Sequence, residues 1–316
     1  MRRGGRGLLP AVLAVAVALA PAACGAPRED GDAVRVGFSQ LSAEGSWRAA
    51  NTASVRAALT PEHGFDLRLS EDEQKQEGQV AALRRFIAED VDVIAFSPVV
   101  EDGWDQVLRE ARDAGIPVVL VDRSITTALP DAYVTRIGAD FRAEGRRAGR
   151  WVLRNAPGAE VFELQGTLGS GAQVGRQEGF DALVGDAVVG AATGGFTRAG
   201  GRDVTAAALE AWPGLDLVFA HNDDMALGAV EALRAAGRRP GVDVRVVSVD
   251  GTRDALRALA AGDLDLVVEC DPQFGDQLAR VLRRVAAGED VPASTTVPGG
   301  VFDRSVTAEQ VAARAY

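Results

Sequence analysis

The chain has 316 residues, of which 47% are hydrophobic and 25% charged, a composition typical of a globular protein with room for two domains. Its formal net charge of −11 argues against nucleic acid as the main partner, because binding to phosphates needs clustered positive charge. Two cysteines and two histidines leave little material for a metal site or for a catalytic thiol with a histidine to activate it.

The N-terminal segment 1–23 has the features of an export signal, with three arginines followed by an apolar stretch too short to span a membrane comfortably. Residues 22–25, AACG, resemble a lipoprotein cleavage box, in which Cys24 becomes the lipidated first residue and 24–33 a tether. Pro21 departs from that box, and an ordinary signal peptidase also suits the segment. We expect an exported protein, either anchored to the membrane by lipid or free in the periplasm or outside the cell.

Strand-like and helix-like segments alternate in the first half of the chain. The predicted strands are 34–38, 65–69, 91–96 and 117–121. The predicted helices between them are 47–59, 74–88 and 103–114. Nearly continuous apolar residues in the last two strands are typical of strands buried on both faces. The repetition predicts a parallel sheet covered by helices on both sides.

The same pattern then starts again in the second half. The predicted strands are 133–137, 160–164, 187–192, 215–220, 244–249 and 264–269, and the predicted helices are 143–155, 172–183, 202–211, 225–236 and 254–261. A helix at 273–287, a short strand at 294–297 and a helix at 308–313 complete the chain. The sequence therefore predicts an α/β fold with two wound, parallel-sheet lobes of Rossmann-like type.

Polar side chains follow several predicted strands directly, and they should meet because carboxyl ends of parallel strands share one edge. After the first strand come Glu44, Ser46, Trp47 and Arg48, a mixture suited to a sugar. An indole covers the C–H face of a sugar ring, while carboxylate and guanidinium groups bond to its hydroxyls. Two other interpretations stay open at this point: Trp47 as a core residue, and the aspartates and asparagines of the later loops as helix caps.

The sequence offers no strong candidate for catalysis, a metal or a cofactor. The loop 166–171, GTLGSG, lacks the lysine and serine or threonine of a phosphate-binding loop. His221, Asp223 and Asp224 have no further histidine or cysteine at ligand spacing. Cys270 follows an apolar run and is expected to be a buried thiol. No serine occupies a nucleophile elbow, so we predict that the protein is not an enzyme and holds no metal or cofactor.

A series of short blocks runs through the chain: GFSQ at 37–40, Glu44 with WRAA at 47–50, QKQE at 74–77, SPVV at 97–100 with GW at 103–104, IP at 116–117, DRS at 122–124, ELQGT at 163–167, FTR at 196–198, AHNDDM at 220–225 and VDG at 249–251. Taken in order, these blocks resemble the type I periplasmic sugar-binding proteins of ABC importers, and most closely the galactofuranose-binding branch. The likeness covers residues 34–316, nearly the whole exported chain.

The resemblance implies a pair of lobes joined by three crossovers, near 122–133, 269–272 and 292–296. The N-terminal lobe would comprise 34–124 plus 270–292. The C-terminal lobe would comprise 125–269 plus 293–316.

It further implies that the lobes close over one monosaccharide, galactofuranose or a related sugar, and that a monomeric protein delivers it to an ABC permease in the membrane. The residues implied to face the sugar are Glu44, Ser46, Trp47, Arg48, Asp122, Arg123, Asp140, Arg176, Asn222, Asp250 and Gln273. Phe141 departs from the family pattern, which often has asparagine there, and this difference bears on which sugar or ring form fits.

Three other functions fit parts of this pattern. A sugar sensor that presents its closed form to a membrane receptor would share every feature above. The effector-binding half of a LacI-type regulator needs a basic helix-turn-helix before the first strand, where this chain has an export signal. A sugar hydrolase needs two carboxylates on either side of the scissile bond, and Glu44 with Asp250 is the pair that the sequence offers.

Overall fold

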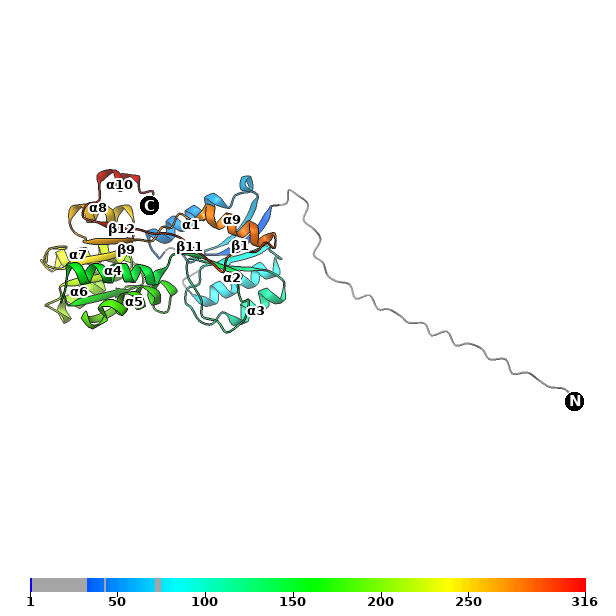
Figure 1. Ribbon diagram of the computed structural model, residues 1–316, viewed down its shortest axis with the longest axis horizontal. Coiled ribbons are helices and arrows are strands. Elements are labelled where there is room, and N and C mark those ends of the chain that lie inside the picture. The colour runs from blue at the N-terminus through cyan, green and yellow to red at the C-terminus, as the bar shows by residue number, and fades with distance from the viewer. Residues whose placement is uncertain (2–32, 43, 72–74) are drawn as a thin grey trace. The chain divides into compact units, whose positions relative to one another are not determined.

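The computed structural model describes residues 1, 33–42, 44–71 and 75–316. Apart from Met1 and Ala33, the predicted signal segment and tether, with Cys24, lie outside these residues. Within the described part, no helix has the length and apolar character needed to cross a membrane. From Ala33 onward the chain forms a compact unit built on two β-sheets, each with its own helices (Figure 1).

The first sheet contains six parallel strands among the described residues. Their order is β11 (Ser294–Thr296), β5 (Thr135–Gly138), β4 (Val118–Val121), β3 (Val93–Phe96), β1 (Val34–Ser39) and β2 (Phe65–Ser70). Helices α1 (Ser46–Ala58) and α9 (Gly275–Ala286) pack against each other in this lobe, as do α2 (Gln76–Ala88) and α3 (Asp105–Asp113). A short 3₁₀ helix, η1 (Pro61–His63), precedes β2.

Side chains of β4 alternate between two hydrophobic clusters. Val119 and Val121 belong to the cluster that includes residues of α1 and α9, while Val118 and Leu120 belong to the cluster that includes residues of α2 and α3. Successive side chains of a strand point to opposite faces, so a strand covered on both sides must be apolar throughout. The prediction that this continuous apolar run forms a strand buried on both faces is therefore confirmed.

The second sheet also contains six strands within the described chain. Their order is β12 (Val301–Asp303), β10 (Leu266–Glu269), β9 (Arg245–Asp250), β8 (Leu217–Ala220), β6 (Val161–Gln165) and β7 (Val188–Thr193). All pair in parallel except β12, which is antiparallel to β10 and was not predicted. The accompanying helices are α4 (Phe141–Asn155), α5 (Gly171–Val184), η2 (Gly185–Ala187), α6 (Arg198–Ala211), α7 (Asp223–Ala235), α8 (Arg253–Ala261) and α10 (Ala308–Ala313). The predicted fold class, two wound parallel sheets, is confirmed.

The strand pairing differs from the predicted lobe limits in two places. β5 pairs with β4, so the first sheet extends to Gly138 and the first crossover lies at 139–140 rather than at 122–133. β11 pairs with β5, so the chain returns to the second sheet at 297–300 rather than at 292–296. The middle crossover, between β10 and α9, lies where it was predicted. A strand's own apolar pattern shows that it is buried but not which sheet supplies its hydrogen-bonding neighbour.

Glycines allow α4 and α5 to approach each other closely. A Cβ atom on Gly145 would lie 2.1 Å from the carbonyl oxygen of Arg176, and one on Gly179 would lie 2.1 Å from that of Arg142. Only a residue without a side chain fits at either position. This close approach brings Glu144 of α4 beside Arg176 of α5, which matters for the cavity between the lobes.

Candidate functional site

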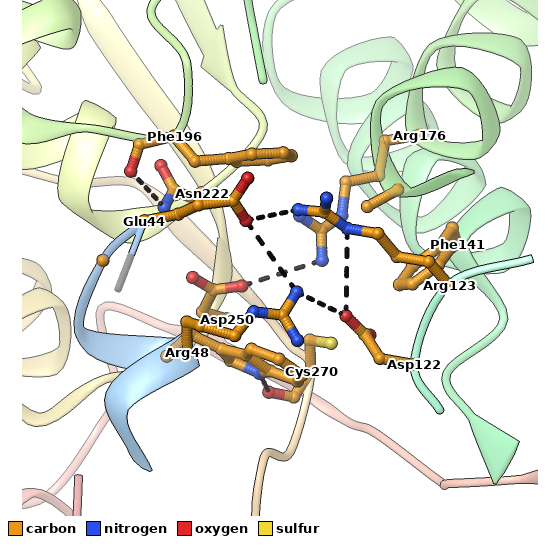
Figure 2. A pocket seen from close by; sticks show the side chains of 13 residues that line it. Glu44, Arg48, Asp122, Arg123, Phe141, Arg176, Phe196, Asn222, Asp250 and Cys270 are labelled. Carbon is orange, nitrogen blue, oxygen red and sulfur yellow. Dashed lines mark hydrogen bonds and ion pairs between the residues drawn. The ribbon is translucent and has the colours of Figure 1, made fainter. Parts of the chain in front are cut away.

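A cavity with about 350 Å³ of space free of protein atoms, part of it open to solvent, lies at the carboxyl ends of the strands of both lobes (Figure 2). Eight of the residues predicted to face a sugar line it: Glu44, Trp47, Arg48, Asp122, Arg123, Arg176, Asn222 and Asp250. They come from both sheets and are far apart in the sequence. The convergence expected at the strand ends is therefore present.

The first lobe contributes two buried ion pairs to the cavity. Arg48, in the first turn of α1, donates to Asp122 Oδ2 at 2.7 Å, and Arg123 pairs with Glu44 Oε2 at 2.5 Å (Figure 2). All four side chains are at most 5% exposed. Burial lowers the pKa of Arg123, and the charge of Glu44 opposes that effect.

The second lobe fixes one guanidinium group from behind. Arg176 donates through Nε to Glu144 Oε2 at 2.9 Å and through Nη1 to the carbonyl oxygen of His221 at 2.5 Å. Its Nη2 is left 3.7 Å from Asp250 Oδ1, on the cavity side. Burial raises the pKa of Asp250 well above its ordinary value, and the charge of Arg176 opposes the shift.

The charges around the cavity balance one another. Three guanidinium groups and three carboxylates, among the described residues, line it. Three buried polar atoms of this set have no hydrogen-bond partner in the described chain: Arg48 Nε, Arg123 Nε and Asp250 Oδ2. Each such atom costs about 1–3 kcal/mol unless a ligand or water meets it. The cavity therefore suits a neutral ligand that carries several hydroxyl groups, rather than an ion.

Backbone strain is concentrated at the same cavity. Asp122, Phe196 and Asp250 have positive φ angles of 66°, 61° and 135°, in a region that residues with a side chain rarely occupy. Such conformations cost about 1–3 kcal/mol each and persist only where the surrounding structure holds them. Asp122 directly follows strand β4, and Asp250 is the last residue of strand β9. Both strained aspartates therefore lie at strand ends, where they line the cavity.

Aromatic side chains form the apolar part of the cavity. Trp47 donates its indole N–H to the carbonyl oxygen of Cys270 at 2.6 Å, which fixes the ring at the crossover. Phe141 and Phe196 lie close to the guanidinium groups of Arg176 and Arg123, at 5.3 and 5.4 Å from the ring centres. Such rings give a flat surface on which the C–H face of a sugar can rest.

Several of these lining residues were not predicted. They are Gly45, Phe141, Ala172, Phe196 and Cys270. Two of them carry a signal in the sequence, since Phe141 departs from the family pattern and Phe196 begins one of the family blocks. Cys270 is free and buried, as expected, and burial raises the pKa of its thiol well above the ordinary value.

Three predicted residues lie outside the cavity. Asp140 accepts a hydrogen bond from the backbone N–H of Ala143 at 2.8 Å and so caps α4. Gln273 is exposed, and its backbone N–H donates to Asp271. Ser46 instead bonds to Asp224 of the other lobe. For Asp140, the helix-cap interpretation is therefore the correct one, because its carboxylate points at the backbone N–H groups of α4.

The lobes touch each other around the cavity. Asp224 of α7 accepts hydrogen bonds from the N–H and Oγ of Ser46 at 2.7 and 2.8 Å. Thr167 donates to Glu44 Oε1 at 3.3 Å, and a backbone hydrogen bond of 2.9 Å runs from Glu101 to Gly169. These contacts join the first lobe to the second, so the structure represents a closed arrangement.

Behind the cavity, the polar residues of the AHNDDM block have structural partners. His221 lies 2.9 Å from Glu163 through Nε2, and burial lowers its pKa. Asp223 accepts from Ser248 and from two backbone N–H groups, and burial raises its pKa to about 6. No group of acidic, histidine and cysteine side chains in the described chain could hold a metal ion.

A family model described as a periplasmic binding protein domain matches residues 36–290. The chain belongs to the periplasmic binding protein family. The galactofuranose-binding protein YtfQ of Escherichia coli K12 is 36% identical over 295 residues, which cover 90% of this chain and 91% of that protein. These matches confirm the resemblance found in the sequence over most of this chain.

Two solved structures are similar to this periplasmic binding protein. One, from Mycobacterium smegmatis in complex with β-D-fucofuranose, is 44% identical with a TM-score of 0.84, covering 89% of this chain and 94% of that one. The other is the binding component of the arabinose ABC transporter of Shewanella sp. ANA-3, bound to α- and β-L-arabinofuranose. It is 40% identical with a TM-score of 0.85, covering 89% of this chain and 95% of that one.

Proposed function

We propose that this chain is an extracytoplasmic solute-binding protein that captures a neutral monosaccharide in its furanose form and delivers it to an ABC permease. The names of the relatives above mention galactofuranose, fucofuranose or arabinofuranose, and two of these relatives have at least 40% sequence identity to this chain. Galactofuranose or a related furanose is accordingly the favoured ligand. The protein binds the sugar without turning it over.

One observation carries this function: the cavity is lined by balanced charges and yet leaves Arg48 Nε, Arg123 Nε and Asp250 Oδ2 unsatisfied. Sugar hydroxyls both donate and accept, so one ring can meet the two donors and the acceptor together. A ligand without hydroxyls would leave these buried groups unpaired. A site of this kind rejects such analogues strongly, because each unpaired group keeps its full desolvation cost.

Closure around the ligand gives the permease a shape to recognise. The cavity is completed by residues of both sheets, so a sugar that contacts both lobes stabilises their closed arrangement relative to an open one. Asp122 and Arg123 lie in the first lobe, whereas Arg176 and Asp250 lie in the second. Hinge closure of two domains around a ligand is a common way to couple binding to a partner.

Isothermal titration calorimetry against a panel of sugars and amino acids tests the binding function. L-Arabinose, D-galactose and D-fucose are expected to include a saturable ligand. Asp250→Asn should weaken its affinity at least about tenfold, because hydrogen bonds to charged groups contribute about 1.5–3 kcal/mol. Asp140→Asn is the matched control, since Asp140 lies outside the cavity and asparagine also caps helices. Binding of amino acids with no response to any sugar would contradict the function.

Export and anchoring are part of the same proposal. We place the signal at 1–23 and lipidation at Cys24, on the AACG motif of the sequence. Replacing Cys24 with serine should then release the mature protein from the membrane fraction. Uptake of labelled sugar by cells that lack the chain should return with the wild type and not with Asp250→Asn. Unchanged uptake in cells without the chain would contradict delivery to a permease.

A further inference from the structure

The exposed side of α4 carries a row of arginines that have no acidic partner. Arg147, Arg150 and Arg154 follow one another at intervals of three and four residues, so they share one side of the helix. None of them makes an ion pair or side-chain hydrogen bond within the described chain. Several other arginines of the described surface do contact carboxylates, as Arg84 does with Glu110 at 2.8 Å.

These arginines form one wall of a groove in the second lobe. The groove, with about 570 Å³ of space that includes open solvent, lies between α4 and the strands β10 and β12 at the edge of the sheet. Both α4 and β12 are labelled in the second lobe in Figure 1. Val301, which is 53% exposed, forms the apolar wall, and Leu266 lies buried behind it at 3% exposed. The two walls therefore differ in chemistry, one cationic and one apolar.

The groove is basic in a protein whose net charge is −11. Arg245 lies next to it, with its guanidinium carbon 5.6 Å from the ring centre of Trp151, which also lines the groove, but its charge is paired with Asp265 at 3.8 Å. The net negative charge of the protein repels an acidic partner, whereas the arginines of the groove attract it. Electrostatic attraction therefore favours binding at the groove and orients the partner there.

The shape of the groove favours a narrow chain over a flat surface. From Arg147 to Arg154 the helix rises about 10 Å, the length of about three residues of extended chain. In such a chain alternate side chains point to opposite sides. Acidic residues can then face α4 while the residues between them face Val301. A flat membrane surface cannot enter the groove and would leave its apolar wall uncovered.

We propose that this groove binds an extended segment of another protein in which acidic and apolar residues alternate. The carboxylates pair with Arg147, Arg150 and Arg154, and the apolar side chains cover Val301. The groove is separate from the sugar cavity, with which it shares no lining residue. Its occupation does not depend on which sugar the protein carries.

Fluorescence anisotropy with a labelled peptide of alternating Asp and Val tests this assignment on the full exported chain. Saturable binding that weakens with added salt is expected. The double variant Arg150→Gln with Arg154→Gln should weaken it about fivefold, because two exposed ion pairs of modest strength are lost. The matched control is Arg109→Gln with Arg280→Gln. It removes the same charge from exposed arginines elsewhere that make no ion pair or side-chain hydrogen bond in the described chain, and it should leave binding unchanged.

Two further arms decide between kinds of partner. A peptide of the same composition with its Asp and Val residues in separate blocks should bind more weakly than the alternating one, and equal binding would overturn the extended, two-walled fit. Phosphatidylglycerol vesicles should bind no better to the wild type than to the double variant. Vesicle binding that requires Arg150 and Arg154, without peptide binding, would overturn the proposal in favour of a lipid surface. An unchanged sugar response in the double variant shows that it folds and separates this result from the sugar function.

Discussion

Ser46 of the first lobe is bound by Asp224 of the second. A single carboxylate oxygen, Asp224 Oδ2, accepts hydrogen bonds from both the backbone N–H and the hydroxyl of Ser46, at 2.7 and 2.8 Å. Gly45 lies so close that a Cβ atom there would be 2.5 Å from the same oxygen. Neither Ser46 nor Asp224 lines the cavity. The contact therefore stabilises the closed arrangement without touching the ligand.

We expect Asp224→Ala to weaken sugar affinity about tenfold by loss of these two exposed hydrogen bonds, because a hydrogen bond of this kind contributes about 0.5–1.5 kcal/mol net. The loss should appear mainly as faster dissociation of the sugar, measured by stopped-flow fluorescence, since the closed state is what Asp224 stabilises. Asp276→Ala, also in the first turn of a helix but exposed and remote from the other lobe, serves as the control. Equal dissociation rates in the wild type and Asp224→Ala would contradict this role.

Glu144 should be essential for stability because it is the nearest carboxylate to the buried guanidinium of Arg176, at 2.9 Å from Nε. Removing one member of a buried ion pair costs about 3–5 kcal/mol, since the other charge is left without compensation. We therefore expect Glu144→Ala to lower the free energy of unfolding by about that amount in urea denaturation. Glu144→Gln keeps an acceptor for Nε and should lose less. Equal losses in the two variants would show that the hydrogen bond to Nε is unimportant, because both variants lack the charge.

Sugar affinity should fall as the solution becomes acidic, and Asp250 should be the cause. Burial holds its pKa well above the ordinary 3.8. A sugar hydroxyl that donates to the carboxylate favours the ionised form, so the pKa is lower in the complex than in the free protein. Affinity is then constant above the raised pKa and declines as the pH falls below it.

Titration calorimetry between about pH 8 and about pH 5 measures this dependence, and the weakest binding is expected at the acidic end. Asp250→Asn should bind weakly at every pH and show a flatter profile, because it has no proton to gain. Burial also raises the pKa of Glu144. Because Asp250→Asn retains Glu144, any pH dependence that Glu144 causes remains visible in this variant. A slope that is unchanged in Asp250→Asn would assign the effect to another group.

Gly145→Ala should destabilise the second lobe. The added Cβ would lie 2.1 Å from the carbonyl oxygen of Arg176, so α4 and α5 would have to move apart. Overpacking of this kind costs about 1–3 kcal/mol, and the thermal midpoint should fall accordingly. Gly185→Ala is the matched control, since its Cβ would come no closer than 3.4 Å to its nearest neighbour, Asp181. Sugar affinity should fall as well in Gly145→Ala, because Arg176 moves with the helix.

The alternation of strands and helices was predictable because burial on one or both faces leaves a periodic trace in the sequence. Strand β4, apolar at every position, shows how directly that trace reports the structure. The crossovers were harder to place. β5 and β11 follow apparent breaks in the pattern, yet they complete the first sheet through hydrogen bonds to β4 and to each other. Pairing of this kind depends on backbone partners, which side-chain periodicity does not encode.

The cavity was predictable where an argument about strand ends applied, and less so in the loops. Asp122 and Asp250 directly end or follow strands and line the cavity. Asp140 begins a helix instead and turns its carboxylate to the backbone, so the next residue, Phe141, takes the place in the cavity wall. At the middle crossover the carbonyl oxygen of Cys270, rather than the side chain of Gln273, makes the contact, and nothing in a side chain's identity predicts that.

The most direct measurement is a crystal structure of the protein with the sugar that it retains on purification. The account predicts one furanose ring between the lobes, resting on the aromatic side chains, with hydroxyls within hydrogen-bond distance of Arg48 Nε, Arg123 Nε and Asp250 Oδ2. A ligand held elsewhere, or a ring in the cavity that leaves all three of these atoms unpaired, would contradict it.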